Sequence, residues 1–197
     1  MPVTALDSRT ALVVIDMQKG IAAGALAHPV AGVSANVFKL TRAFRARGLP
    51  VVLVRVGWAK DGSDALRVRT QAPPPPIQNA PPEFFEYIDG LLVDGGTDIL
   101  VQKRQWGAFY GTDLDLQLRR RQVTGIVLCG ISTSIGVEST ARDAWERAYN
   151  LTFASDALTD RVAEAHERAM SVIFPRLGEI GTTGEIIAFL ARRSESA

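Results

Sequence analysis

Short apolar runs recur along the chain, separated by polar or glycine-rich segments. Runs in which every residue is apolar or nearly so, such as 10–16 and 51–56, are typical of strands buried on both faces of a parallel sheet. Further strands are expected at 98–102, 124–129 and 151–155, with a short last strand within 178–181. Between the strands, helical spacing of apolar residues predicts helices at 34–47, after Thr112, and at 134–149, 161–174 and 185–192.

The alternation of strands and helices predicts an α/β fold, a three-layer sandwich in which helices flank a mainly parallel central sheet. Segment 21–32 is rich in small residues and is expected to be a loop. Residues 57–97 are the least regular part, and their proline run, 73–76, favours an extended backbone. Because neither flank would fold alone, we expect a surface excursion there and a single domain over 1–197.

The composition of the chain limits the kinds of molecule that it is expected to bind. The chain has 197 residues, 47% of them apolar, and its 22 Lys and Arg nearly balance 21 Asp and Glu. A net charge of +1 argues against a nucleic-acid partner. No apolar run approaches the roughly 18 residues of a membrane span, and no signal peptide is evident. A single cysteine, Cys129, suits a reducing compartment, so we expect a cytoplasmic protein that binds a small molecule.

Two charged residues stand where predicted strands end. Asp16 closes the first strand, and Lys103 directly follows the strand at 98–102. The carboxyl ends of parallel strands meet at one edge of the sheet, where open α/β sheets bind ligands. Both residues are therefore candidates for acid–base or substrate-orienting roles. The alternatives are an aspartate that caps a turn and a lysine on the surface, the usual place for a lone lysine.

The stretch 128–140 joins a buried strand to a helix through a turn at Gly130. Backbone N–H groups of residues 134–136 would then lie at a helix N-terminus, where they could stabilise an anion or an oxyanion. Ser132, Ser134 and Ile135 are accordingly candidates for substrate contact. The alternative is an ordinary strand–helix turn without chemistry.

Aromatic side chains follow two of the predicted strands. Trp58 comes after the second strand, and Trp106, Phe109 and Tyr110 lie in a glycine-containing loop after Lys103. Such side chains are candidate walls for a flat or unsaturated ligand, although Trp58 could merely cover the core.

Three segments together resemble the isochorismatase-like family, also called the cysteine hydrolase family. They are Val-Val-Ile-Asp-Met-Gln at 13–18, Val-Gln-Lys-Arg at 101–104 and Ile-Gly-Val-Glu-Ser-Thr at 135–140. The resemblance covers nearly the whole chain and is closest to uncharacterised bacterial members that share the last motif. It implies a Rossmann-like three-layer fold and a homo-oligomer, because members of the family are commonly dimers or tetramers.

Most members of this family carry an Asp-Lys-Cys triad. Asp16 and Lys103 match its first two positions, but Gly136 stands where the cysteine would be. Glycine has no nucleophile, so acyl-enzyme chemistry by that route is excluded. Cys129 lies within a predicted strand and is expected in the core. The resemblance also implies a branch with glycine at this position that hydrolyses a vinyl ether, with the aspartate as general acid.

The resemblance bears on metals and on backbone geometry as well. Nicotinamidase-type members hold a metal through Asp and His ligands, whereas this chain has only His28 and His166 and no Asp-x-His after the second strand. His166, expected midway along a helix, is interpreted as a surface or hydrogen-bonded residue, so we expect no metal and no cofactor. The peptide bond between Ile131 and Ser132 is expected to be cis.

The leading hypothesis is a hydrolase that acts on a small, anionic substrate without a cysteine nucleophile. Asp16 would act as general acid/base and Lys103 would orient the substrate, while Gly136 would contribute only its backbone. The alternative is a catalytically inactive homologue that binds a small molecule or acts as a scaffold. Convergence of Asp16 and Lys103 on a closed pocket beside residue 136 would favour the hydrolase, whereas surface partners for both would favour the alternative.

Overall fold

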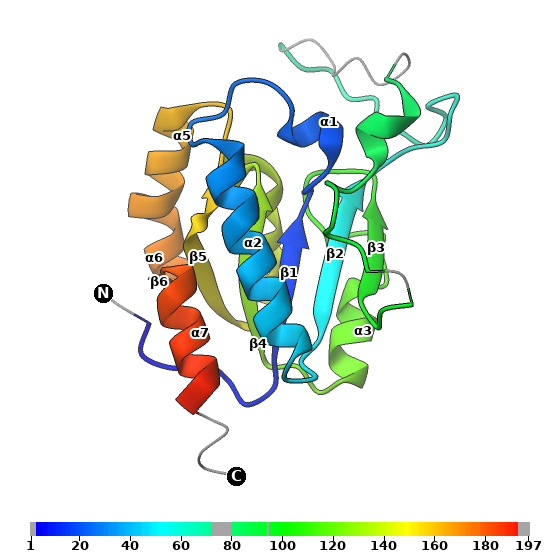
Figure 1. Cartoon of the computed structure of the whole chain (residues 1–197). Coiled ribbons are helices and arrows are strands. Elements are labelled where there is room, and N and C mark those ends of the chain that lie inside the picture. The colour runs from blue at the N-terminus through cyan, green and yellow to red at the C-terminus, as the bar shows by residue number, and fades with distance from the viewer. Residues whose placement is uncertain (1–2, 72–79, 94, 193–197) are drawn as a thin grey trace.

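A sheet of six parallel strands forms the centre of the molecule in the computed structural model, which describes residues 3–71, 80–93 and 95–192 (Figure 1). The strands lie in the order β3-β2-β1-β4-β5-β6, and every pairing between them is parallel. Their bounds are β1 (Thr10–Ile15), β2 (Val51–Val56), β3 (Ile99–Lys103), β4 (Gly125–Ile131), β5 (Asn150–Thr159) and β6 (Glu179–Gly181).

Helices cover both faces of the sheet. Figure 1 shows α2 and α7 in front of it and α3 and α4 behind it. The α-helices are α1 (Lys19–Ala22), α2 (Val30–Arg45), α3 (Leu114–Arg120), α4 (Glu138–Glu146), α5 (Ala163–Arg168), α6 (Phe174–Leu177) and α7 (Thr183–Arg192). Three shorter elements complete the set: a 3₁₀ helix, η2 (Pro82–Phe85), and two π-helical turns, η3 (Thr133–Val137) and η4 (Ala169–Ile173).

The central strand β1 is buried along its whole length, and its side chains alternate between two cores. Val13 and Ile15 pack with α3 and α4 on one face, whereas Leu12 and Val14 pack with α2 and α7 on the other. The strand has no solvent-facing side, which explains why its sequence is a continuous apolar run and not an alternating one.

Gly130 allows β4 to lie close against the end of β1. Its φ is +118°, and a Cβ at this position would lie only 2.0 Å from the backbone oxygen of Ile15. The register between β4 and β5 shifts at the same point, between Leu128 and Gly130. Only glycine fits here, and the chain leaves the sheet into the turn that follows.

The predicted α/β class and the parallel sheet are confirmed. The strand at 51–56 is placed without error, whereas the strand expected at 151–155 extends over β5 because its second half pairs with β4 beyond the shift. Helix α2 begins at Val30 and not at Ser34, since Pro29 stands just before the helix and favours its start.

Three other expectations need correction. Part of the loop expected at 21–32 belongs to α1, which the small residues concealed. The helix expected at 134–149 is a π-helical turn followed by α4, and the helix expected at 161–174 is interrupted by η4. The proline run 73–76 lies outside the described residues.

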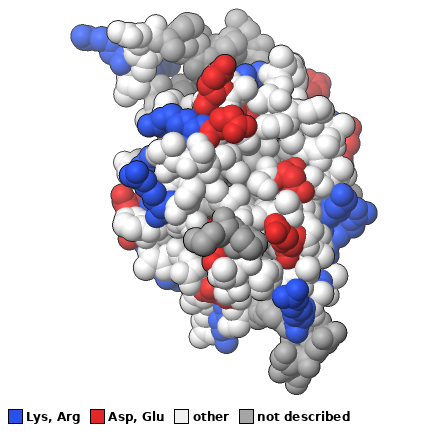
Figure 2. Space-filling model, turned by 90° about the vertical axis from the view of Figure 1, so that its left-hand side faces the viewer, with Lys and Arg blue, Asp and Glu red and all other residues white. Residues whose placement is uncertain are grey.

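The surface carries charges of both signs. On the side shown in Figure 2, Lys and Arg are interspersed with Asp and Glu and form no large area of one sign. Over the described ranges, none of the helices combines the length and hydrophobicity that a membrane crossing requires.

Candidate active site

The candidate site lies where the strand order reverses. From β1 the chain builds the sheet outward through β2 and β3, and then returns to place β4 on the other side of β1. Open α/β sheets commonly bind ligands at such a point, beyond the carboxyl ends of the strands. Asp16 directly follows β1, and η3 follows β4, so the sheet brings both to this edge.

Lys103 reaches the same point from two strands away. It is the last residue of β3 and is paired in register with Val56 of β2, so its side chain crosses the end of β2 to reach β1. Its Nζ donates to Oδ2 of Asp16 at 2.7 Å and to the backbone oxygen of Gln105 at 3.1 Å. The lysine is 2% exposed and is therefore no surface lysine. The two charges therefore pair with each other and not with partners on the surface.

The Asp16 carboxylate is buried and only half satisfied. The residue adopts a left-handed conformation, with φ +48°, while its N–H donates to the oxygen of Val54 at 3.0 Å. Its Oδ2 accepts from Lys103, but its Oδ1 is buried and has no hydrogen-bond partner among the described residues. A buried oxygen without a donor is costly, and such atoms often await a ligand.

Burial raises the pKa of the Asp16 carboxyl to about 6, and the Lys103 ammonium only partly offsets this rise. An ordinary aspartate is fully ionised at neutral pH, whereas this one holds a proton in a substantial fraction of molecules near pH 6. A carboxyl poised in this range can act as a general acid or base.

Gly136 faces Asp16 from η3. A Cβ built at this position would lie 3.1 Å from Oδ2 of Asp16 and 3.0 Å from Cγ2 of Ile15. Residue 136 therefore adjoins Asp16, and with no side chain here its backbone lies directly against the carboxylate. The cis peptide bond expected between Ile131 and Ser132 is confirmed.

The backbone donors expected at 134–136 need correction. The N–H of Ser134 donates to Oδ2 of Asp160 at 2.7 Å, and the Ser134 hydroxyl donates to the same oxygen at 2.9 Å. The N–H of Ile135 donates to the oxygen of Ser132 at 3.2 Å. These two amides already have acceptors within the chain, so they do not form an oxyanion hole in this arrangement.

The aromatic candidates fall into two groups. Trp106 and Tyr110 are exposed, and the oxygen of Trp106 would lie 3.6 Å from a Cβ at Gly136, which places its loop beside the site. Trp58 is half-buried, and its Nε1 donates to the oxygen of Arg104 at 2.9 Å. Phe109 is no pocket wall: it is buried in the core behind the sheet and stacks on Tyr149 at a centroid distance of 5.9 Å.

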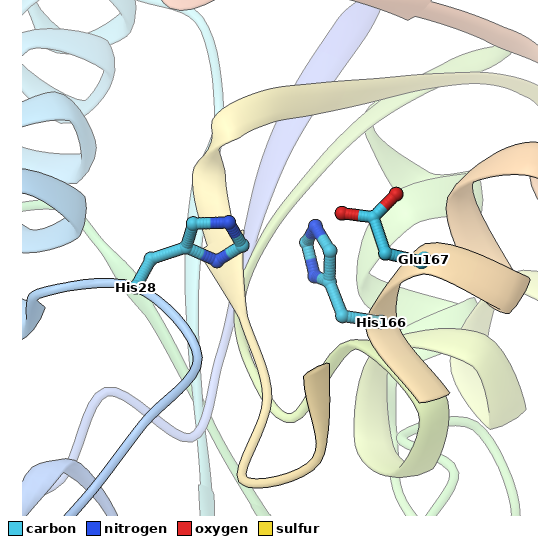
Figure 3. Close-up of side chains that lie close together, drawn as sticks. All are labelled: His28, His166 and Glu167. Atoms are coloured by element: carbon cyan, nitrogen blue, oxygen red, sulfur yellow. The ribbon is translucent and has the colours of Figure 1, made fainter. Parts of the chain in front are cut away.

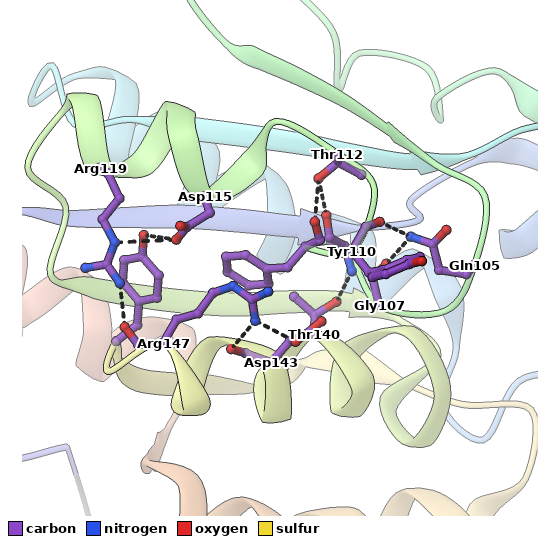
Figure 4. Close-up of polar contacts among 12 residues, drawn as sticks. Gln105, Gly107, Tyr110, Thr112, Asp115, Arg119, Thr140, Asp143 and Arg147 are labelled. Atoms are coloured by element: carbon purple, nitrogen blue, oxygen red, sulfur yellow. Dashed lines mark hydrogen bonds and ion pairs between the residues drawn. The ribbon is translucent and has the colours of Figure 1, made fainter.

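Polar contacts fix the loop that carries these aromatics (Figure 4). The side-chain amide of Gln105 donates to the oxygens of Gly107 and Tyr110. The Thr140 hydroxyl of α4 donates to the oxygen of Gly136 at 2.7 Å and accepts from the N–H of Ala108 at 3.1 Å. One side chain thus holds the loop and η3 together on either side of Asp16.

Four residues that support the site were missed by the sequence analysis: Gln18, Gln105, Thr140 and Asp160. Gln18 is fully buried, and its side chain bonds both the N–H and the oxygen of Val56, which ties the segment after β1 to β2. Its position two residues after Asp16 was the only signal available, since a glutamine beside a strand end is usually a surface residue. Thr140 and Asp160 bond to segments that are distant in the sequence and that a sequence alone does not pair. Gln105 bonds to the backbone of its own loop, where no local pattern predicts such a contact.

Comparison with known proteins identifies the family of this chain. The model of the isochorismatase domain matches residues 10–185. The chain belongs to the isochorismatase family. It is 49% identical over 181 residues to the uncharacterised isochorismatase family protein YecD of Escherichia coli O157:H7, covering 90% of this chain and 94% of YecD. The solved structure of an isochorismatase family protein from Burkholderia thailandensis superposes with a TM-score of 0.90 at 45% identity, covering 95% of this chain and 98% of that one.

More distant relatives in this family carry enzyme names. The ureidoacrylate amidohydrolase RutB of Rhizobium rhizogenes is 33% identical over 179 residues, which cover 79% of this chain and 72% of RutB. The isochorismatase family is thus a hydrolase family, and the family and fold predicted from the sequence are confirmed.

Gly136→Ala is expected to lower the free energy of unfolding by about 1–3 kcal/mol, because the added methyl group presses on Ile15 and Asp16 in a packed region. Gly32→Ala in α2 is the matched control, since no atom lies within 4 Å of its Cβ position, and it should be neutral or stabilising by up to about 1 kcal/mol. Urea unfolding at one pH measures both. Equal stability of the two variants would show that position 136 has more room than the distances indicate.

Proposed function

We propose that this protein is a hydrolase of a small, anionic substrate, with Asp16 as general acid/base, Lys103 as the cation that orients the substrate, and no cysteine nucleophile. The observation that carries the proposal is the Asp16 carboxyl: it is buried, has one oxygen without a partner among the described residues, and has a pKa raised to about 6. A site that had lost its activity would have no physical need for such a group.

An anionic substrate would resolve a conflict between the two charged residues. In the substrate-free site, Lys103 favours the ionised form of Asp16 and so opposes its use as an acid. A substrate carboxylate beside Lys103 would neutralise the ammonium, and a second negative charge near Asp16 would disfavour its ionisation. Binding of the substrate would therefore load the proton onto Asp16 at the moment when the proton is needed.

The absence of a nucleophile at residue 136 directs the proposal towards substrates that are activated by protonation. In a vinyl ether, Asp16 would deliver its proton to the terminal carbon of the double bond, which gives an oxocarbenium-like centre. Water would add to that centre and return a proton to Asp16, and collapse of the hemiketal would release an alcohol and a ketone. Cys129 is no substitute nucleophile, because it is buried within β4 and burial raises the pKa of its thiol.

The test is product detection by mass spectrometry. The purified protein is offered isochorismate, as an anionic vinyl ether, beside a panel of neutral and anionic small amides. We expect release of pyruvate from isochorismate and no product from the amides, because residue 136 offers no nucleophile to attack an amide carbon. Turnover of an amide would show that the nucleophile has been misplaced. Asp16→Asn should abolish the product, and Asp89→Asn, which changes a highly exposed carboxylate, should leave it unchanged.

Two outcomes would contradict the proposal. Product formation that survives in Asp16→Asn would assign the proton transfer to another group. Binding of the anions, measured by calorimetry, without product from any of them would support the alternative, a binding homologue without turnover.

A further inference from the structure

We propose that His28, His166 and Glu167 form a binding site for a divalent transition-metal ion, with Zn²⁺ as the best match. The site is separate from the Asp16 site and does not depend on the proposed hydrolase function. His28 lies in the segment that connects α1 to α2, and His166 and Glu167 are neighbours on α5.

The three side chains converge from segments far apart in the sequence. Figure 3 shows the two imidazole rings facing each other, with the Glu167 carboxylate beside the His166 ring. The ring centroids are 4.6 Å apart at an interplanar angle of 63°, and one ligand atom from each of the three residues lies within 4.8 Å of the others. Ligands bound to one tetrahedral Zn²⁺ at 2.0–2.1 Å lie roughly 3.4 Å apart. The ligand atoms would have to approach one another when the ion binds, and Glu167 is exposed and can change rotamer to do so.

A hydrogen-bond relay leaves the outer nitrogen of His166 free. The Thr133 hydroxyl donates to the backbone oxygen of Thr159 at 3.0 Å, so it has no proton left for the histidine. Its contact of 2.9 Å with Nδ1 of His166 must then be an N–H of the ring that donates to the hydroxyl. The lone pair of His166 is therefore on Nε2, and the ring is held in the manner typical of metal-bound histidines.

His28 is held by the end of the same strand. Its backbone N–H donates to the Thr159 hydroxyl at 3.1 Å, and its Nδ1 lies 3.4 Å from that oxygen. Both rings are thus anchored through their Nδ1 sides at the carboxyl end of β5, which leaves both Nε2 atoms for a ligand. A site whose ligands are already oriented loses less entropy when the ion binds.

The chemistry of the ligand set also fits this class of ion. Two imidazole nitrogens and one carboxylate form a set that suits Zn²⁺ better than Mg²⁺ or Ca²⁺, which prefer oxygen ligands.

The expectation that the chain binds no metal rested on the missing Asp-x-His after the second strand, and the present cluster uses other residues. An ion here would join the segment before α2, α5 and, through Thr133, the turn η3 that carries Gly136. Its role would be structural, because Asp16 belongs to a different contact network on the other side of η3.

The test is titration of the chelator-treated full chain with ZnCl₂ by isothermal calorimetry. We expect one Zn²⁺ per chain and a rise in the melting temperature on addition of the ion. His28→Gln and Glu167→Gln should each weaken Zn²⁺ binding by roughly tenfold or more. Loss of a residue that only hydrogen-bonds to a metal ligand already weakens metal binding by at least about tenfold, and loss of the ligand itself should cost no less. Neither side chain is buried in the core, so both variants should fold.

Glu164→Gln is the matched control, because Glu164 is an exposed carboxylate on the same helix outside the cluster. It should bind Zn²⁺ like the unmodified protein. Substitution with Co²⁺ adds a spectroscopic readout, namely the visible absorption of a tetrahedral cobalt site, which His28→Gln should reduce. Absence of binding, or binding that is equal in all four proteins, would overturn the proposal. Neither result would bear on the role of Asp16.

Discussion

Lys103→Met is expected to lower the free energy of unfolding by about 3–5 kcal/mol at pH 8 and by little at pH 5. At pH 8 the replacement leaves the ionised Asp16 carboxylate buried without the ammonium that pairs with it. At pH 5 the carboxyl is mostly protonated in the folded protein, because burial raises its pKa to about 6. Methionine then replaces a buried ammonium with an apolar chain of similar length, and the substitution costs little.

The direction of this pH dependence follows from proton linkage. The unfolded chain ionises Asp16 near its ordinary value of 3.8, while the folded chain retains the proton up to about pH 6. Between these values the folded state binds more protons, so stability falls as pH rises, and the fall ends at the folded pKa. Removal of Lys103 raises the folded pKa further, so the variant continues to lose stability above pH 6 where the unmodified protein no longer does.

Urea unfolding at pH 5, 6.5 and 8 measures the effect. Lys39→Met is the matched control. Lys39 is exposed on α2, and its ammonium donates a hydrogen bond to Oδ1 of Asn36. It should change stability by less than about 0.5 kcal/mol at every pH. A loss for Lys103→Met that is independent of pH would show that packing, and not the charge of Asp16, determines the cost.

Asp16→Asn is expected to reduce kcat/KM about 10²–10⁴-fold towards any substrate that the product screen identifies. The amide has the size of the carboxyl but has no proton to transfer, so the general acid is lost while the shape of the site is kept. In the unmodified protein, kcat/KM should fall about tenfold per pH unit above the Asp16 pKa of about 6, because only the protonated acid is active.

A second variant separates this role from a purely structural one. Lys103→Gln removes the cation that lowers the Asp16 pKa, so the falling limb of the kcat/KM profile should move to higher pH. A merely structural change would lower the rate without moving the limb. A profile that rises through pH 6 would identify the ionised carboxylate as a base in the first step and contradict the acid role.

The main features of the site could be predicted because they depend on strand topology. Asp16 and Lys103 end two apolar runs. Parallel strands bring their carboxyl ends to one edge of the sheet regardless of the conformation of the loops. Their direct contact could not be predicted, because it requires Lys103 to reach across β2 and depends on the strand order. The order itself is decided by packing between segments that are distant in the sequence.

Side-chain partners account for the expectations that failed. Ser134 looked like a donor for substrate, but its N–H and hydroxyl are taken by Asp160, which lies beyond the end of β5. Phe109 shares a loop with the exposed Trp106 and Tyr110, yet it turns into the core because Tyr149 offers it a stacking surface. Local sequence shows that a residue is aromatic or polar, but not which neighbour the fold will supply.

The bridge made by Thr140 has a consequence for how a substrate enters. Because this side chain fastens Ala108 to α4, the loop that carries the aromatics is anchored at its middle and has little freedom to swing as a lid. The Trp106 and Tyr110 side chains of this loop are exposed, so they can change rotamer without any opening of the backbone. Rotamer changes of exposed side chains take picoseconds to nanoseconds, so motion of this loop would not limit the rate of turnover.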